Sequence, residues 1–209
     1  MSLKQGRSGS GGERALPQGF EEHAGHGNLG HVIRTARREA KRTLMQVAED
    51  SDLSISFLSQ VERNLLTPSV SALKRIADVL KIPAGSLMFG LESSSRGPNV
   101  SLIRSDSRKR VVFPQSHIAY EMLTPDLRRR MSIFWLNAPP RSQSGPPFSH
   151  EGEDAVIVLK GTLRVEIGEV WHELKKGDSL YFNSELPHRW ANETSRSAEV
   201  MWISTPPSF

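Results

Sequence analysis

The sequence contains no cysteine among its 209 residues. This absence excludes disulfide bonds, thiol nucleophiles, iron–sulfur clusters and cysteine-ligated zinc sites. It fits a reducing compartment, so we expect a cytoplasmic protein. The chain also lacks an apolar run of the ~18 residues that a membrane span requires, and no signal-peptide pattern opens it. We therefore expect no membrane partner.

A large excess of one charge is also lacking, because 27 basic and 23 acidic residues give a formal net charge of +4. The charges are unevenly distributed. Residues 29–147 carry 18 basic and 10 acidic groups, whereas residues 148–209 carry 6 basic and 10 acidic groups. A basic front and an acidic back indicate two parts with different partners, and the basic part suits a polyanion.

Apolar periodicity is nearly absent from residues 1–28, which contain seven of the 16 glycines. Such a composition cannot bury enough apolar surface to fold, and it predicts a disordered tail. Residues 92–99 have the Ser, Gly and Pro content of a linker. Two folded domains are therefore expected, over residues 29–91 and 100–209.

The first domain has the periodicity of amphipathic helices, with apolar residues recurring every three to four positions from Leu29 to Ala40. Capping residues divide it into five short helices, a five-helix bundle. The predicted boundaries are a Thr43–Gln46 capping box, Ser54 as an N-cap, Asn64 as a stop, Thr67-Pro68 as a start, and Pro83 as a stop before a fifth helix at 84–88.

The second domain changes to the period-two alternation of β-strands, with runs rich in Val, Ile, Phe, Tyr and Trp. About ten such runs without intervening helices indicate an antiparallel sandwich or barrel, so the fold class is multidomain α + β. The predicted strands are 100–103, 110–113, 117–123, 131–136, 155–159, 162–167, 170–174, 179–182, 188–190 and 199–203.

Two predicted helices, near 44–50 and 55–63, are joined by a tight turn and have the shape of a helix-turn-helix. The second helix of such a pair presents its N-terminal side chains to base edges in the major groove. In spacing, caps and apolar positions, residues 29–90 resemble the phage-repressor-like (XRE-type) helix-turn-helix transcriptional regulators. The resemblance implies a double-stranded DNA operator as partner. A helical bundle that only packs on the second domain is the alternative.

By position in this family, Gln60 would pair with adenine and Ile55 would contact a thymine methyl group. Ser54, the amides that follow it and Arg63 would meet phosphates. The predicted DNA-binding residues are Leu44, Ser54, Ile55, Ser56, Ser59, Gln60 and Arg63.

The resemblance also implies an ion pair between Arg37 and Glu62, which would fix the angle of the reading helix. The family usually has glycine where this chain has Asp52 and Asn64. Asp and Asn tolerate a positive φ best among the other residues, so the geometry is expected to survive. The family's Gly-Leu before the second helix is replaced by Lys41-Arg42.

Two later segments resemble the two motifs of the cupin family. Residues 148–161 match the first motif, with Asp154 in its acidic position, and residues 177–192 match the second, with His188 in its histidine position. The likeness covers about residues 140–204. It implies a double-stranded β-helix, that is, a jelly-roll barrel.

The family's metal ligands fall on Phe148, His150, Asp154 and His188. A phenyl ring thus replaces one imidazole, and aspartate is one methylene shorter than the family's glutamate. His150, Asp154 and His188 still form a two-histidine, one-carboxylate set suited to a divalent metal. We set this against a metal-free pocket that uses the same groups as hydrogen-bond partners, which we prefer at this point. The cofactor therefore stays open.

Strand parity places Phe148 with His150, and His188 with Trp190, on one side of their strands, where a barrel mouth holds small ligands. The acidic residues Glu151 and Glu153 nearby would suit an amine or amino-acid-like ligand. Residues 205–209 resemble the ending of putrescine-utilisation repressors. The predicted ligand-binding residues are Phe148, His150, Asp154, His188 and Trp190.

Together these features predict a sequence-specific DNA-binding regulator whose cupin domain binds a small-molecule effector that changes its DNA affinity. We expect a homodimer paired through the cupin domains, because one module binds DNA weakly and two half-sites supply the rest. The sequence has no Ser/His/Asp triad or P-loop motif, so we expect no catalytic residues. A metal-dependent cupin enzyme fused to a DNA-binding domain is the alternative.

Overall fold

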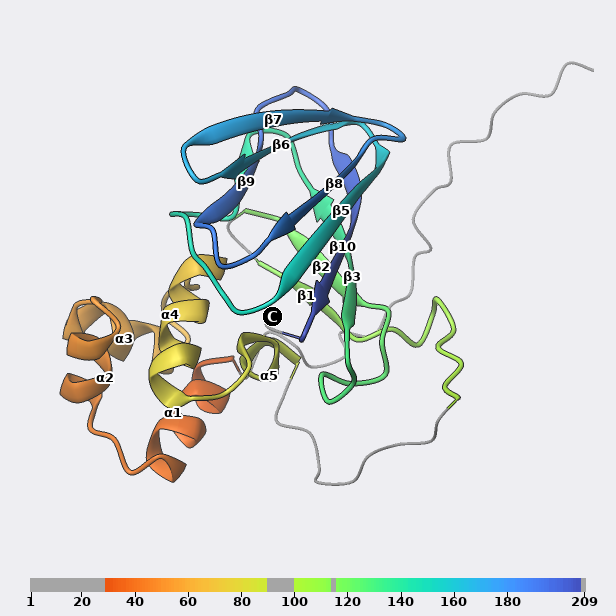
Figure 1. The fold of residues 1–209 in the computed structure, drawn as a ribbon. Coiled ribbons are helices and arrows are strands. Elements are labelled where there is room, and N and C mark those ends of the chain that lie inside the picture. Colours follow the sequence, from red (N-terminus) through yellow and green to blue (C-terminus); the bar gives the residue numbers. More distant parts are fainter. Residues whose placement is uncertain (1–28, 90–99, 114–115, 208–209) are drawn as a thin grey trace, which may run out of the picture.

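The computed structural model describes residues 29–89, 100–113 and 116–207. Over these residues five helices are followed by ten strands, which confirms the expected multidomain α + β class (Figure 1). The predicted tail 1–28 and linker 92–99 lie outside the described residues. Within that part of the chain, none of the helices has the length and apolar character needed to cross a membrane.

Capping side chains set the start of two helices as the sequence predicts. Thr43 and Gln46 form the reciprocal capping box of α2. The Ser54 hydroxyl accepts a hydrogen bond from the Phe57 amide at 3.0 Å and so begins α3. The helices are α1 (Leu29–Glu39), α2 (Leu44–Asp50), α3 (Ile55–Glu62), α4 (Val70–Leu80) and α5 (Ala84–Phe89).

The predicted start of α4 is wrong by two residues. Its N-cap is Ser69, whose hydroxyl accepts from the Ala72 amide at 3.2 Å, so Thr67 and Pro68 stand before the helix. Thr67 and Ser69 both have a hydroxyl suited to an N-cap. The helix starts after Ser69 because its hydroxyl bonds to an amide of the first turn. The helix ends at Lys81, which has a left-handed φ of 56°.

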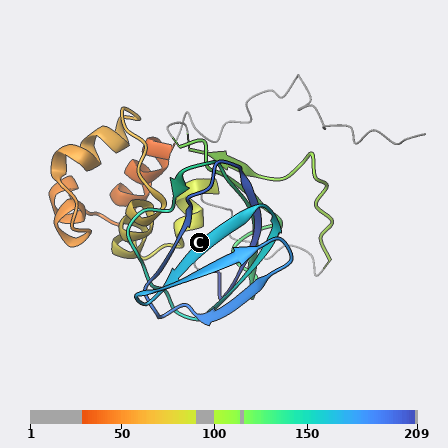
Figure 2. The same cartoon turned by 90° about the horizontal axis from the view of Figure 1, so that it is seen from above.

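Ten strands form two antiparallel sheets, in the orders β1-β2-β3-β10-β5-β8 and β4-β9-β6-β7. The two sheets face each other to form a barrel (Figures 1 and 2). The strands are β1 (Arg110–Val112), β2 (Ala119–Met122), β3 (Ser132–Ala138), β4 (Ser142–Gln143), β5 (Glu153–Lys160), β6 (Thr162–Ile167), β7 (Val170–Lys175), β8 (Ser179–Asn183), β9 (His188–Asn192) and β10 (Ala198–Thr205).

Two strand predictions are wrong. Residues 100–103 form no strand, because Val100 and Leu102 are 86% and 73% exposed and their alternation faces no core. Strand β4 was not predicted, because it is only two residues long and exists through its pairing of Ser142 with Asn192. A strand this short has no periodicity of its own to detect.

Strand β10 lies at the centre of the larger sheet, paired with both β3 and β5. Alternate residues of β10 are buried, so Trp202 lies inside the barrel beside Phe134 of β3 and Val156 of β5. This strict alternation fixes the register, since a one-residue slip would turn every inward side chain to solvent.

Helices α4 and α5 lie between the other helices and the barrel (Figures 1 and 2). Phe89 of α5 stacks on Phe134 of β3, with ring centroids 5.6 Å apart and planes 17° from parallel. Buried residues of the helices and of the barrel belong to one hydrophobic cluster. The two parts therefore pack against each other directly.

We predict that Lys81→Gly raises the free energy of unfolding by about 0.5–1 kcal/mol, because glycine adopts a left-handed φ without the Cβ penalty. Urea denaturation measures this change. Lys176→Gly is the control, since Lys176 is exposed and has no positive φ, and it should not stabilise the protein. An equal effect of both substitutions would contradict the account.

Candidate functional sites

Four predicted base-reading residues share one side of α3, because positions 55, 56, 59 and 60 are helical neighbours. Ile55 is 48% exposed and Ser56 is also exposed, whereas Ser59 and Gln60 are half-buried. The Gln60 amide donates to the Ser56 hydroxyl at 3.3 Å. The polar side chains of Ser56, Ser59 and Gln60 on this side of α3 can donate and accept hydrogen bonds, as base recognition requires.

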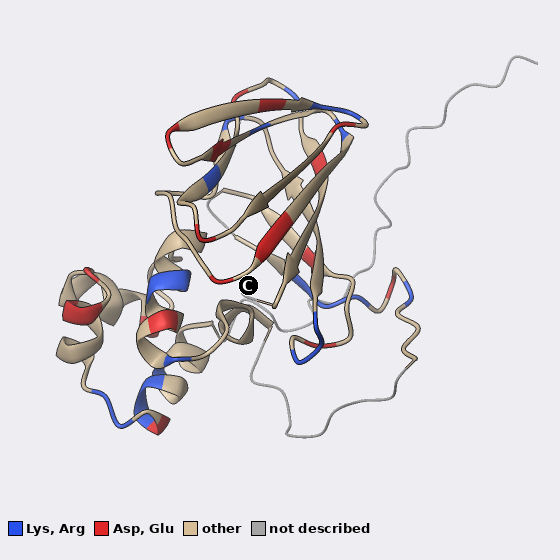
Figure 3. Cartoon of the chain, viewed as in Figure 1, with Lys and Arg blue, Asp and Glu red and all other residues tan. Residues whose placement is uncertain are grey.

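The other predicted DNA-contact residues differ in exposure. Arg63 is exposed at the C-cap of α3, and Ser54 is exposed at its N-cap. Leu44, in contrast, is half-buried and packs against the hydrophobic core. Helix α3 itself carries no Lys or Arg, whereas α1 and the turn that follows it are basic (Figure 3). Positive charge therefore flanks the predicted reading helix, and the base-facing positions are neutral.

The predicted ion pair between Arg37 and Glu62 is present and bidentate. Arg37 Nε and Nη2 donate to the Glu62 carboxylate at 2.6 and 2.9 Å, and Nη1 donates to the Arg42 carbonyl at 2.9 Å. The bond to Glu62 raises the pKa of Arg37. Because Arg37 lies on α1, its planar guanidinium locks α3 and the turn before α2 to one helix.

The predicted left-handed positions are also confirmed. Asp52 and Asn64 have φ values of 52° and 56°, and Lys41 has a φ of 54°. The Asn64 side chain accepts a hydrogen bond from the Gly30 amide at 2.8 Å. A glycine at position 64 could not make this bond, so Asn64 offsets part of its backbone strain by joining α3 to α1.

A small cavity of about 20 Å³ lies at the mouth of the barrel, on the side of the helices. All five predicted ligand-binding residues line it. The lining residues are Val70, Tyr120, Phe134, Phe148, His150, Asp154, His188, Arg189, Trp190 and Trp202.

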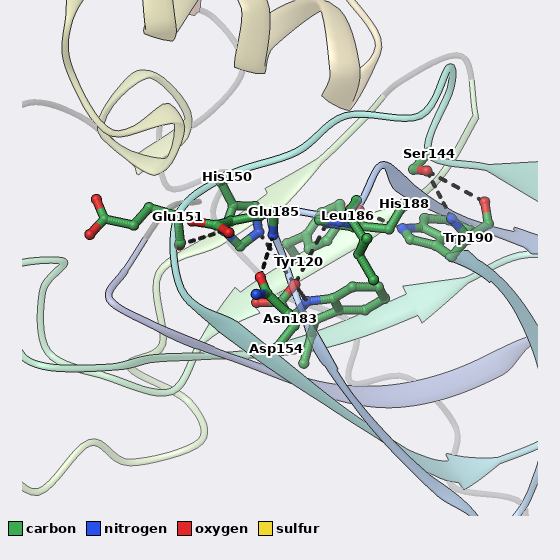
Figure 4. A network of polar contacts seen from close by, with 11 residues as sticks. Tyr120, Ser144, His150, Glu151, Asp154, Asn183, Glu185, Leu186, His188 and Trp190 are labelled. Carbon is green, nitrogen blue, oxygen red and sulfur yellow. Dashed lines mark hydrogen bonds and ion pairs between the residues drawn. The ribbon is translucent and has the colours of Figure 1, made fainter. Parts of the chain in front are cut away.

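Two imidazoles converge on one carboxylate in this cavity (Figure 4). Asp154 Oδ2 lies 3.3 Å from His150 Nε2 and 3.7 Å from His188 Nε2. The three side chains are 5% exposed or less. The Trp202 indole donates to the same oxygen at 2.8 Å and holds the carboxylate in place.

Backbone carbonyls determine which nitrogen of each histidine faces the carboxylate. Nδ1 of His150 contacts the Glu151 carbonyl at 3.1 Å, and Nδ1 of His188 contacts the Leu186 carbonyl at 2.9 Å. A carbonyl only accepts, so each Nδ1 donates a proton to its carbonyl, and this bond turns the Nε2 atom of each ring toward Asp154 in the cavity. Metal-ligating histidines are oriented in this way in proteins.

Burial lowers the pKa of His188, against the raising effects of the Leu186 carbonyl and of Asp154, and nearby His150 and Lys74 lower it further. Its ring is therefore neutral near pH 7, as a metal ligand must be.

The cavity leaves two buried polar atoms without a partner. Within the described residues, neither Asp154 Oδ1 nor His188 Nε2 has a hydrogen-bond partner. A bound cation would give both atoms the partner that buried polar groups require. The ligand atoms of His150, Asp154 and His188 lie within 4.8 Å of one another. The residues thus fit a divalent metal ion bound by two histidines and one carboxylate.

Five cavity residues were not predicted from the sequence: Val70, Tyr120, Phe134, Arg189 and Trp202. Tyr120 accepts a hydrogen bond from the Trp190 indole at 3.2 Å, and Phe134 and Trp202 come from β3 and β10. Strand parity could have placed Trp202 inside the barrel, with the other alternate residues of its strand. Val70 belongs to α4, and no pattern in the sequence signals that a helical residue lines a barrel cavity.

Comparison with known proteins identifies both domains. A family profile described as "Helix-turn-helix domain" matches residues 28–87, and one described as "Cupin domain" matches residues 134–204. The immunity repressor protein of Bacillus phage phi105 is 37% identical over 144 residues, which span 66% of this chain and 88% of the repressor. The chain belongs to the XRE-type helix-turn-helix transcriptional regulators and carries a C-terminal cupin domain.

Two further relatives extend over both domains of the regulator. HTH-type transcriptional regulator PuuR of Escherichia coli is 21% identical over 181 residues, covering 86% of this chain and 96% of PuuR. The crystal structure of an HTH_3 family transcriptional regulator from Vibrio cholerae has a TM-score of 0.67 at 21% identity and covers 87% of this chain and 96% of its own. The second likeness supports the fold of the regulator.

Removing one partner of the Arg37–Glu62 pair should leave a buried charge uncompensated. We predict that Glu62→Ala lowers the free energy of unfolding of the regulator by about 3 kcal/mol in urea denaturation. The control is Glu199→Ala, which breaks a surface pair with Lys160, a residue whose side chain is 70% exposed. This change should cost less than about 1 kcal/mol. Equal losses would refute the structural role of Glu62.

Proposed function

We propose that this DNA-binding transcriptional regulator holds a divalent metal ion in its cupin cavity and responds there to a small-molecule effector that changes its DNA affinity. The observation that carries the proposal is the pair of Nε2 atoms at 3.3 and 3.7 Å from one buried carboxylate oxygen. This buried polar cluster does not stabilise the fold, since buried polar groups without a partner lower the free energy of unfolding.

His150, Asp154 and His188 would supply three ligands to the ion, and Trp202 would orient the carboxylate from behind. Phe148 stands where the family has a further histidine, with its ring centroid 4.7 Å from that of His188. Its phenyl ring excludes water but cannot ligate. A bound metal would offer its open positions to an electron-pair donor of the effector.

The effector we propose is an amine or amino-acid-like metabolite. Glu151 and Glu153 are exposed beside the cavity residues His150 and Asp154 and would attract a positively charged ligand. Apart from Val70 and Arg189, whose charge is paired with Glu166, the cavity wall beyond the triad is aromatic. Aromatic rings suit both the apolar body of such a ligand and its ammonium group.

We propose that the regulator works in the cytoplasm as a homodimer joined through its cupin domains. One helix-turn-helix whose reading helix carries no Lys or Arg offers few phosphate contacts, so a single head binds DNA weakly. Two heads on half-sites one helical turn apart, roughly 34 Å, supply the missing affinity. Ser54, Ile55, Ser56, Ser59, Gln60 and Arg63, with the start of α2 at Leu44, are the proposed DNA contacts.

A metal-dependent enzyme is the second candidate, because a two-histidine, one-carboxylate set also serves non-haem iron oxygenases. The relatives with whole-chain coverage are transcriptional regulators, which favours sensing. Incubation of the iron-loaded protein with candidate amines under oxygen decides between them: product formation with no change in DNA binding identifies an enzyme.

Metal loading tests the triad. We predict that the purified regulator binds one Co²⁺ per chain in equilibrium dialysis and that His188→Ala weakens binding about 100-fold or more, since even loss of an outer-shell partner costs 10–100-fold. His172→Ala is the matched control, because His172 lies on β7 and outside the triad. Absence of binding by the native protein would remove the metal from the proposal.

Base reading by Gln60 has a separate test. We predict that Gln60→Ala weakens binding to a duplex selected by the native protein from a random pool by roughly 1–3 kcal/mol and leaves binding to unselected duplexes nearly unchanged. Gln143→Ala, at an exposed position on the barrel, should change neither. Fluorescence anisotropy at fixed salt measures both affinities. Equal weakening on both kinds of duplex would show that Gln60 does not read bases.

A further inference from the structure

The DNA-binding domain contributes part of the wall of the cupin cavity. Val70, the first residue of α4, lines the cavity opposite barrel residues such as His150 and His188 and is only 4% exposed. Among the lining residues it is the one that comes from the helices, in the described part of the chain. An occupant of the cavity would therefore touch both domains of the same chain.

The loop between β4 and β5 rests directly on the start of α4. A Cβ placed on Gly145, whose φ is 109°, would lie 2.5 Å from Ser71 Oγ and 3.3 Å from Ser69 Cβ, so the loop backbone comes very close to these two side chains. Ser71 is 2% exposed beneath the loop. The same loop continues into Phe148 and His150 of the cavity. A shift of α4 would thus open the cavity at its edge.

The size of the cavity requires such an opening. A volume of about 20 Å³ exceeds the ~10–15 Å³ that one water needs, but it is far below the ~300–1,000 Å³ of organic-ligand pockets. The barrel walls are held by continuous ladders, since β5 pairs with both β10 and β8. Across the described residues, by contrast, no backbone hydrogen bond joins α4 to loop 144–150.

We propose that α4 is the movable wall of the cavity: an organic occupant displaces Val70 and the start of α4 from loop 144–150 and thereby shifts the DNA-binding domain against the barrel. The inference rests on the proposed function, because it takes the cavity to be the effector site. Helix α4 contacts α2 of the helix-turn-helix, so its displacement reaches the DNA-reading unit. Val70 is then a residue that determines which effectors fit.

The cysteine-free chain allows a direct test of the movement. In full-length Val70→Cys, the single thiol reacts with a thiol reagent only when α4 leaves the barrel. Two reference variants set the limits of the rate. Val158→Cys, inside β5 at 1% exposure, gives the rate of a thiol that reacts only when the barrel unfolds, and Val170→Cys, at 59% exposure, gives the rate of an accessible thiol. We expect the thiol of Val70→Cys to react at least 100-fold faster than that of Val158→Cys and more slowly than that of Val170→Cys. A rate equal to either reference overturns the proposal.

A disulfide lock tests whether the movement admits a ligand. In Ser71→Cys/Gly145→Cys the two new side chains lie within bonding reach. Imidazole is the probe, and its binding to the Co²⁺-loaded full chain is followed by cobalt absorption. The oxidised variant should bind imidazole at least tenfold more weakly than the same variant after reduction, a comparison in which any strain at residue 145 cancels. Equal binding in both states overturns the role of α4 as a wall.

The two experiments separate the inference from the function on which it rests. If the native protein takes up no Co²⁺, the metal part of the proposed function fails, and the thiol rates, which need no metal, still decide whether α4 moves. If Co²⁺ and imidazole bind and the lock has no effect, the effector site stands and the movable wall is refuted.

Discussion

The buried carboxylate of Asp154 is the constraint on which the barrel mouth is organised. Its side chain is fully buried, accepts from Trp202, and faces the Nε2 atoms of His150 and His188. The carbonyls of Glu151 and Leu186 hold both rings in that orientation, so the arrangement does not relax by turning a ring. Asp154 Oδ1 and His188 Nε2 have no hydrogen-bond partner among the described residues, which costs stability. The proposed cation would give both atoms a partner.

The position of this site relative to the helices gives it a route to DNA binding. Val70 of α4 forms part of the cavity wall, and Phe89 of α5 stacks on Phe134, which also lines the cavity. On the DNA side, Arg37 ties α1 to α3 through Glu62 and to the turn before α2 through the Arg42 carbonyl. The helix-turn-helix is thereby a stiff unit, and a displacement at its barrel side changes the placement of the whole head rather than its internal geometry.

Features that depend on short-range sequence signals could be predicted from the sequence. Features that depend on contacts between distant segments could not. The Thr43–Gln46 box, the Ser54 cap and the left-handed Asp52 and Asn64 depend on neighbours within four residues, and the structure confirms them. The motif histidines also met in one cavity as expected. The failures at residues 100–103 and at β4 share a cause, since an apolar alternation specifies a strand only where a partner strand and a core exist. Val70 was unpredictable for the same reason, because its role depends on how two domains dock.

The replacement of a family histidine by Phe148 leaves three side chains, His150, Asp154 and His188, as the proposed metal ligands. Phe148 packs against both histidine rings, at centroid distances of 4.7 Å to His188 and 6.2 Å to His150, and so stiffens the triad without ligating. A site with three protein ligands binds a metal less tightly than one with four, and its affinity then responds more to an added ligand. A metal ion and an effector that bind together at the proposed site would be coupled, because each would raise the affinity of the other by the same factor. Reciprocal binding of this kind, next to a wall supplied by the DNA-binding domain, is what a regulator needs to convert occupancy into a change of DNA affinity.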